Sequence, residues 1–198
     1  VGPGWGNGRA MAVQLAEEGA RVLAVDRDLQ RLEETLERAG EARHSIQVWA
    51  GDVTHSASVQ EMVQHCLKTF GGLDILINNV GGSAAGGPVE MSEEVWDTQI
   101  NVNLKSVFLT CKHVLPTMVA QRRGAIVNVA SASGLRWTGS AQVAYAATKA
   151  AQHNLIQSQA RDYARDNVLL NTLAPGLIDT DRNAHRRDED PEGWAEYV

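Results

Sequence analysis

The stretch GPGWGNGRAMA at residues 2–12 decides the fold, because its glycines stand directly before a helix-like run. Gly2, Gly6 and Gly8 fit the spacing G-x-x-x-G-x-G. Glycine permits positive φ and, having no Cβ, lets a phosphate group approach the backbone. The helix that starts at Asn7 would turn its N-terminal N–H groups toward that anion. The stretch predicts a phosphate-binding loop, and the alternative is an ordinary glycine-rich turn.

Downstream of the loop, apolar runs alternate with helical patterns. The spacing predicts strands over 21–26, 45–50, 73–79, 125–130 and 167–174, and helices over 7–18, 28–40, 54–70, 92–121 and 143–164. Right-handed βαβ connections then predict an α/β fold with a doubly wound, mostly parallel sheet of the Rossmann type, in three α/β/α layers. We expect one domain over residues 1–198, with its ligands at the carboxyl ends of the strands.

Composition narrows the classes of partner. The chain of 198 residues carries a formal net charge of -6, which gives it no electrostatic attraction to nucleic acid or to an anionic membrane surface. No run approaches the roughly 18 apolar residues of a membrane span. The histidines are scattered, so we expect no metal site. Cys66 and Cys111 are expected to be buried free thiols, which favours a reducing, cytoplasmic compartment.

Asp26 ends the predicted strand 21–26, 20 residues after Gly6. A carboxylate at this spacing accepts hydrogen bonds from an adenosine ribose and repels a 2′-phosphate, so it favours NAD over NADP. Arg27 keeps NADP open, because a guanidinium beside that site can bind a 2′-phosphate. The alternative role of Asp26 is to cap the helix that starts near Asp28.

Two further stretches, GDVT (51–54) and NNVGG (78–82), follow predicted strands. Asp52, Val53, Asn79 and Gly81 would border a dinucleotide in a Rossmann-type layout. Each stretch is equally compatible with a plain Asx turn or glycine loop.

The stretch YAATK places Tyr145 and Lys149 four residues apart on a predicted helix, so both side chains share one face. A tyrosine hydroxyl ordinarily has a pKa of about 10, and a neighbouring ammonium favours its ionised form. Such a pair can move a proton to or from an alcohol oxygen. Ser131 follows the strand 125–130, where its hydroxyl could hold a substrate oxygen or satisfy a local turn.

The glycine loop, Asp52, NNVG, NVNL, SASG, YAATK and PGLIDT occur in the order found in short-chain dehydrogenases/reductases. The chain resembles the compact, non-extended branch of that family over nearly its whole length. The resemblance implies that Tyr145 is the acid/base, that Lys149 promotes its ionisation and binds the nicotinamide ribose, and that Ser131 bonds the reacting oxygen. It implies that Asn103 holds a water linking Lys149 to solvent. It also implies cofactor contacts from Asn79, Pro175, Gly176 and Thr180.

The function implied by this resemblance is reversible hydride transfer between NAD(P) and a secondary alcohol or its ketone, in a homodimer or homotetramer. The competing hypothesis is a catalytically silent cofactor-binding or scaffold protein on the same fold. Residues 181–198 are expected to form a substrate lid, or alternatively a solvated loop. Trp137 either lines the substrate pocket or packs locally.

Some positions depart from the family pattern. Val80 stands where alanine is usual, and Asn7 stands where isoleucine is common. Ser131 lies 14 residues before Tyr145, one more than usual, and Ser133 lies 12 before it. Ser131 is preferred because Ser-x-x-Gly matches the family.

A strand should precede the glycine loop, and the family carries a further helix and strand after PGLIDT. We therefore expect a fragment that lacks the first and last strands. Whether a targeting peptide precedes it stays open. Alone, such a fragment should fold poorly, because neighbouring strands would have unpaired edges.

Overall fold

The computed structural model describes residues 5–178, 180, 188–189 and 192. The chain divides into two compact units. The first unit is Val1–Gly51 together with Gly176–Val198, and the second is Asp52–Pro175.

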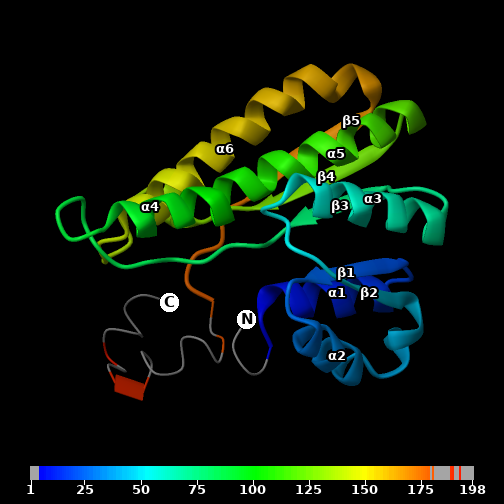
Figure 1. The fold of residues 1–198 in the computed structure, drawn as a ribbon, viewed down its shortest axis with the longest axis horizontal. Helices are drawn as coiled ribbons and strands as arrows, with labels where there is room; N and C mark the ends of the chain where they lie inside the picture. Colours follow the sequence, from blue (N-terminus) through cyan, green and yellow to red (C-terminus); the bar gives the residue numbers. More distant parts are fainter. Residues whose placement is uncertain (1–4, 179, 181–187, 190–191, 193–198) are drawn as a thin grey trace. The chain divides into compact units, whose positions relative to one another are not determined.

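The first unit contains two helix–strand pairs, drawn in blue in Figure 1. Its elements are α1 (Asn7–Glu17), β1 (Val22–Asp26), α2 (Leu29–Arg38) and β2 (Ile46–Ala50). The strands pair in parallel, with Val22 opposite Ile46 and Asp26 opposite Ala50. Because parallel strands need a crossover, α2 returns the chain from one strand to the next. A small core holds the unit together through Val13, Ala16, Ala39 and Ile46.

The second unit is a three-stranded parallel sheet with helices packed on it (Figure 1). Its strand order is β3-β4-β5. The elements are α3 (Ser56–Phe70), β3 (Ile75–Asn78), α4 (Glu93–Gln99), α5 (Ser106–Gln121), β4 (Gly124–Val129), α6 (Val143–Tyr163) and β5 (Val168–Leu173). This unit has an apolar core of fully buried side chains from α5, β4 and α6. It includes Val114, Met118, Ile126 and Ile156.

Local sequence signals explain three of the helix ends. The Asp28 carboxylate accepts a hydrogen bond from the Gln30 N–H and caps α2, a contact typically worth about 1 kcal/mol. Ser92 caps α4 in the same way through the Val95 N–H. Gly71 ends α3 with φ of 80°, a left-handed conformation that glycine adopts without strain.

The α/β class with parallel strands is confirmed, with the described strands forming one sheet of two and one of three. The helical region predicted over 92–121 is present, but it is not one regular α-helix. A π-helical segment, Ile100–Lys105, separates α4 from α5. Such segments occur frequently at functional sites. None of the described helices is long and apolar enough to cross a membrane.

Candidate functional site

Helix α6 brings Tyr145 and Lys149 together, as their spacing predicts. The ammonium nitrogen of Lys149 lies 5.6 Å from the centre of the Tyr145 ring. Tyr145 is half-buried, whereas Lys149 is only 3% exposed. The pair is therefore a buried cation beside a phenol and not a solvated surface pair.

The ammonium group of Lys149 has two hydrogen-bond partners in the protein. Its Nζ donates hydrogen bonds to the Val129 carbonyl oxygen at 2.9 Å and to Oε1 of Gln152 at 3.2 Å. Removal from water disfavours the charged form, so burial lowers the pKa of Lys149 from 10.5 to about 8. The group remains mostly protonated at neutral pH and can release its proton in mild alkali.

Asn103 lies in the π-helical segment and is completely buried. Its Nδ2 donates to the Gly82 carbonyl oxygen at 3.0 Å and to Thr148 Oγ1 of α6 at 3.3 Å. Its Oδ1 accepts from the Gly82 N–H at 2.9 Å. Asn103 therefore joins the loop after β3 to the helix that carries Tyr145 and Lys149.

Gly81 lies directly against these side chains. A Cβ built on it would stand 3.0 Å from Oδ1 of Asn103 and 3.3 Å from Nζ of Lys149. The glycine thus allows the backbone after β3 to approach the catalytic candidates closely. Asn79, in the same loop, is half-buried.

Asn78, which precedes Asn79, is buried and has a structural role. Its Oδ1 accepts from Thr110 Oγ1 at 2.7 Å, and its Nδ2 lies 3.8 Å from Sγ of Cys111. Burial raises the pKa of the Cys111 thiol to about 11. Both cysteines are free and buried, as predicted.

Ser131 begins a short turn, Ala132–Gly134, directly after β4. Its Oγ accepts from the Ser133 N–H at 3.2 Å, and the Ser133 hydroxyl lies 3.0 Å from Thr138 Oγ1. A Cβ on Gly134 would stand 2.6 Å from the backbone of Lys149 and Ala150. The absence of a side chain at Gly134 therefore lets the serine turn pack on α6.

Two loops near these elements pair with each other. The Gly86 N–H donates to the Ala141 carbonyl oxygen at 2.9 Å, and the Val143 N–H donates to the Gly86 carbonyl oxygen at 3.1 Å. The second loop carries exposed apolar side chains, with Trp137 73% exposed and Leu135 66% exposed. The local-packing interpretation of Trp137 does not fit this exposure.

In the first unit, Gly6 is the N-cap of α1, and Asn7 and Gly8 lie in the first helical turn. The N-cap residue makes no side-chain hydrogen bond to this end of the helix. The following residue, Arg9, is buried and binds Glu34 of α2 at 2.8 Å. This ion pair fixes the start of α1 against α2.

The two acidic candidates both make local contacts. Oδ1 of Asp26 accepts from the Asp28 N–H at 3.0 Å, and Asp28 itself caps α2. Oδ1 of Asp52 accepts from the Thr54 N–H at 2.8 Å in an Asx turn.

The remaining predicted residues lie on loops. Val53 is half-buried, and the Pro175 carbonyl accepts from the Ala132 N–H at 2.9 Å. Gly176 is exposed and Thr180 is half-buried. Gly2 and most of the predicted lid over 181–198 lie outside the described residues.

Sequence reasoning did not single out Gln152, which contacts Lys149, or Gln99, whose Oε1 accepts from Asn103 at 3.1 Å. The available signal was the spacing along the helix. Gln152 follows Lys149 by three residues and Gln99 precedes Asn103 by four, so each shares a face with a candidate residue.

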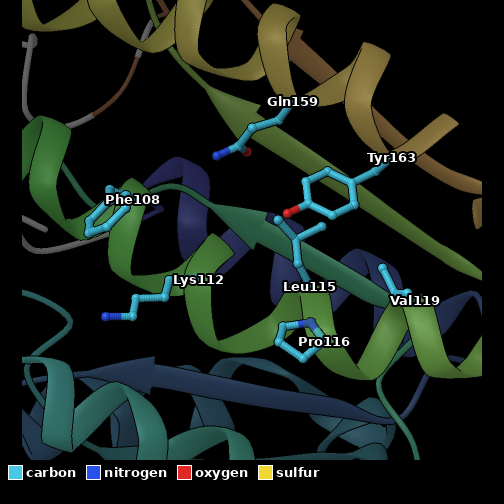
Figure 2. A pocket seen from close by; sticks show the side chains of 7 residues that line it. All are labelled: Phe108, Lys112, Leu115, Pro116, Val119, Gln159 and Tyr163. Carbon is cyan, nitrogen blue, oxygen red and sulfur yellow. The ribbon is translucent and has the colours of Figure 1, made fainter.

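A separate groove with a volume of about 360 Å³ lies between α5 and α6 (Figure 2). Its lining is mostly apolar and comes from both helices, with Phe108, Lys112, Leu115, Pro116, Val119, Gln159 and Tyr163. It shares no lining residue with the Tyr145–Lys149 cluster.

The chain is similar to known proteins. The family model described as short chain dehydrogenase matches residues 1–191. An uncharacterized oxidoreductase of Staphylococcus aureus (strain MRSA252) is 36% identical over 203 residues, which cover 100% of this chain and 87% of that protein.

Solved structures are also similar. A short-chain dehydrogenase/reductase structure from Burkholderia xenovorans has a TM-score of 0.90 and 49% identity, over 95% of this chain and 72% of that one. A 3-oxoacyl (acyl-carrier-protein) reductase of Agrobacterium tumefaciens C58 with NADP bound has a TM-score of 0.84 and 42% identity, over 95% and 72%.

Proposed function

Because the chain belongs to the short-chain dehydrogenase family, we propose that it is an oxidoreductase acting between a nicotinamide cofactor and a secondary alcohol or its ketone. The observation that carries the proposal is the buried ammonium of Lys149, held beside the Tyr145 ring. A buried cation with fixed partners next to a phenol is suited to proton transfer at a substrate oxygen.

In this proposal Tyr145 takes the alcohol proton during oxidation and returns it during reduction. The positive charge of Lys149 favours the phenolate that must form. Ser131 binds the same substrate oxygen through its hydroxyl, and it is preferred because the Ser133 hydroxyl is paired with Thr138. Asn103 holds the loop after β3 against α6. When bound, the cofactor supplies or accepts the hydride.

The residues present fit such a cofactor. The N-cap of α1, Gly6, has no side chain that could cap the helix, and a helix N-terminus favours an anion such as a pyrophosphate. Gly81 keeps the space beside Lys149 free of a side chain, and the ammonium uses two of its three N–H groups on protein acceptors. Further proposed contacts come from Asp52, Val53, Asn79, Pro175, Gly176 and Thr180.

We propose that NAD is the preferred form. Asp26 ends β1, and its carboxylate keeps one oxygen beyond the Asp28 contact for a ribose. A 2′-phosphate would meet that negative charge. Arg27 is exposed beside it, and the Agrobacterium reductase binds NADP, so the assay must include both cofactors.

The substrate is proposed to be a small molecule, and the assembly a homodimer or homotetramer. The groove between α5 and α6 supports self-association, because Phe108 there is 47% exposed (Figure 2). The two free, buried thiols support a reducing, cytoplasmic location.

The deciding experiment measures turnover against a panel of alcohols and ketones with NAD and with NADP. We expect turnover with a higher kcat/KM for NAD. In the Tyr145→Phe variant, loss of the hydroxyl should lower kcat by about 10²- to 10⁴-fold while cofactor binding persists.

Tyr163→Phe is the matched control, because it removes the same hydroxyl group at the far end of the same helix and keeps the aromatic ring that lines the groove. Its turnover should stay close to that of the wild type. Turnover of Tyr145→Phe within a few-fold of the wild type would contradict the acid/base role. Tight cofactor binding by the wild type without turnover would favour the silent binding protein instead.

A further inference from the structure

Gln152 is completely buried on α6, and both ends of its amide contact groups of the proposed active site. Its Nε2 donates a hydrogen bond to the main-chain carbonyl oxygen of Asn103. Its Oε1 accepts from the ammonium of Lys149 at 3.2 Å and from Nδ2 of Asn128 at 3.3 Å. One side chain therefore connects the π-helical segment, α6 and β4.

These contacts determine how the amide is oriented. Its oxygen faces two donors, Lys149 and Asn128, and its NH₂ group faces a carbonyl oxygen. If the amide were reversed, its NH₂ group would face the two donors and its oxygen would face the carbonyl oxygen, so none of these hydrogen bonds could form. The arrangement therefore specifies an acceptor at Lys149.

The acceptor matters because Lys149 has little access to water. At 3% exposure, its charged form depends on protein partners, which are the Val129 carbonyl and Gln152. Loss of one partner would leave a buried N–H group unmatched. The two partners also limit how the flexible side chain can place its nitrogen.

We propose that Gln152 is a positioning residue whose amide joins the main chain of Asn103 to the ammonium of Lys149 and holds that ammonium beside Tyr145. The catalytic consequence rests on the proposed function, whereas the contact itself does not.

The titratable and charged groups around Lys149 determine how a change in its pKa can be interpreted. On α6, the titratable side chains one turn away are Tyr145 and His153. The elements packed around it present the neutral groups of Gly81, Val129 and Asn103. Charged residues of the neighbouring segments are exposed, namely Glu93, Glu94, Asp97, Lys105 and Arg136.

The contact is tested by NMR of protein labelled with ¹³C at the lysine ε carbons. The chain has four lysines, so Lys149→Met assigns the Lys149 signal by its disappearance. The wild-type signal should titrate near pH 8. Gln152→Met keeps the volume but removes the acceptor, so the pKa of Lys149 should fall by about half a unit or more.

Gln152→Glu provides the opposite change, because a carboxylate beside the ammonium should raise the pKa of Lys149. Ile156→Val, a buried change one turn further along α6, is the packing control and should leave the titration unchanged. Thermal melts establish that each variant is folded. An unchanged titration in folded Gln152→Met, or no rise in Gln152→Glu, would overturn the proposal.

The effect on catalysis is measured with the substrate identified in the panel of alcohols and ketones. Gln152→Met should lower kcat by about tenfold, with little change in the KM for the alcohol, and shift the pH at half-maximal oxidation upward. Ile156→Val should do neither. Equal kcat and pH profiles in Gln152→Met and wild type would overturn the positioning role. Failure of wild-type turnover would refute the proposed function and leave the NMR test intact.

Discussion

At the scale of single residues, Lys149 combines a positive charge with burial, and the combination has a thermodynamic consequence. Its pKa is 10.5 in an ordinary environment and about 8 in the folded protein. Between these values the unfolded chain binds the proton and the folded chain does not. By proton linkage, this group's contribution to stability rises with pH through that interval.

We therefore expect the free energy of unfolding to gain about 3 kcal/mol from Lys149 between pH 8 and 10.5. The Lys149→Met variant lacks this contribution. Urea denaturation of both proteins at intervals across this range measures it, because the difference between them should change steadily with pH.

The difference in stability between wild type and Lys149→Met isolates Lys149, because all other titratable groups are present in both proteins. Cys111 has a pKa raised from 9.0 to about 11, so its contribution to stability falls above pH 9 in both proteins. Stability curves that stay parallel for wild type and Lys149→Met would show that burial does not perturb Lys149.

At the scale of secondary-structure elements, local signals predicted most boundaries. The two glycines at 71–72 predicted the end of α3, because a left-handed residue is needed there and glycine supplies it. The π-helical segment could not be predicted in this way. Its sequence INVNLK has no helix-breaking residue, and the buried Asn103 contacts residues distant in sequence, Gly82 and Thr148.

In the candidate site too, some residues could be predicted from local spacing and others could not. Tyr145 and Lys149 were predictable because one helix sets their spacing. The contacts of Gln152 depend on three elements meeting, and a polar residue on a helix is usually expected to face solvent. Gly134 was noted only as part of Ser-x-x-Gly, whereas its close approach to α6 is a tertiary contact.

Gly134→Ala tests the packing of the serine turn on α6. The new Cβ would lie 2.6 Å from the backbone of Lys149 and Ala150, so one element must move. We expect a loss of about 1–3 kcal/mol in stability, or roughly 2–10 °C in Tm. Activity should fall further than stability does, because the turn carries Ser131.

Gly82→Ala is the matched control for Tm, since a Cβ there meets nothing within 4 Å. A thermal melt of the two variants beside the wild type gives the comparison. Equal Tm values for Gly134→Ala and Gly82→Ala would mean that the turn does not need the close contact.

At the scale of the whole molecule, the groove between α5 and α6 is the feature that bears on assembly. Its apolar lining includes Leu115 and Val119, and Phe108 at its edge is nearly half exposed (Figure 2). Burial of such exposed apolar surface at a contact between subunits is favourable, because it removes the surface from water. In a two-fold dimer the same face occurs on both subunits, so each copy supplies the surface that the other covers.

Phe108→Arg should separate the proposed oligomer, because two-fold symmetry would bury the new charge against an identical face that already carries Lys112. Leu29→Arg on α2 is the matched control, since Leu29 is 49% exposed and Phe108 is 47% exposed. Light scattering coupled to gel filtration should give a dimer or tetramer for the wild type and Leu29→Arg, and a smaller species for Phe108→Arg. A monomeric wild type, or an unchanged mass for folded Phe108→Arg, would exclude this groove as the contact.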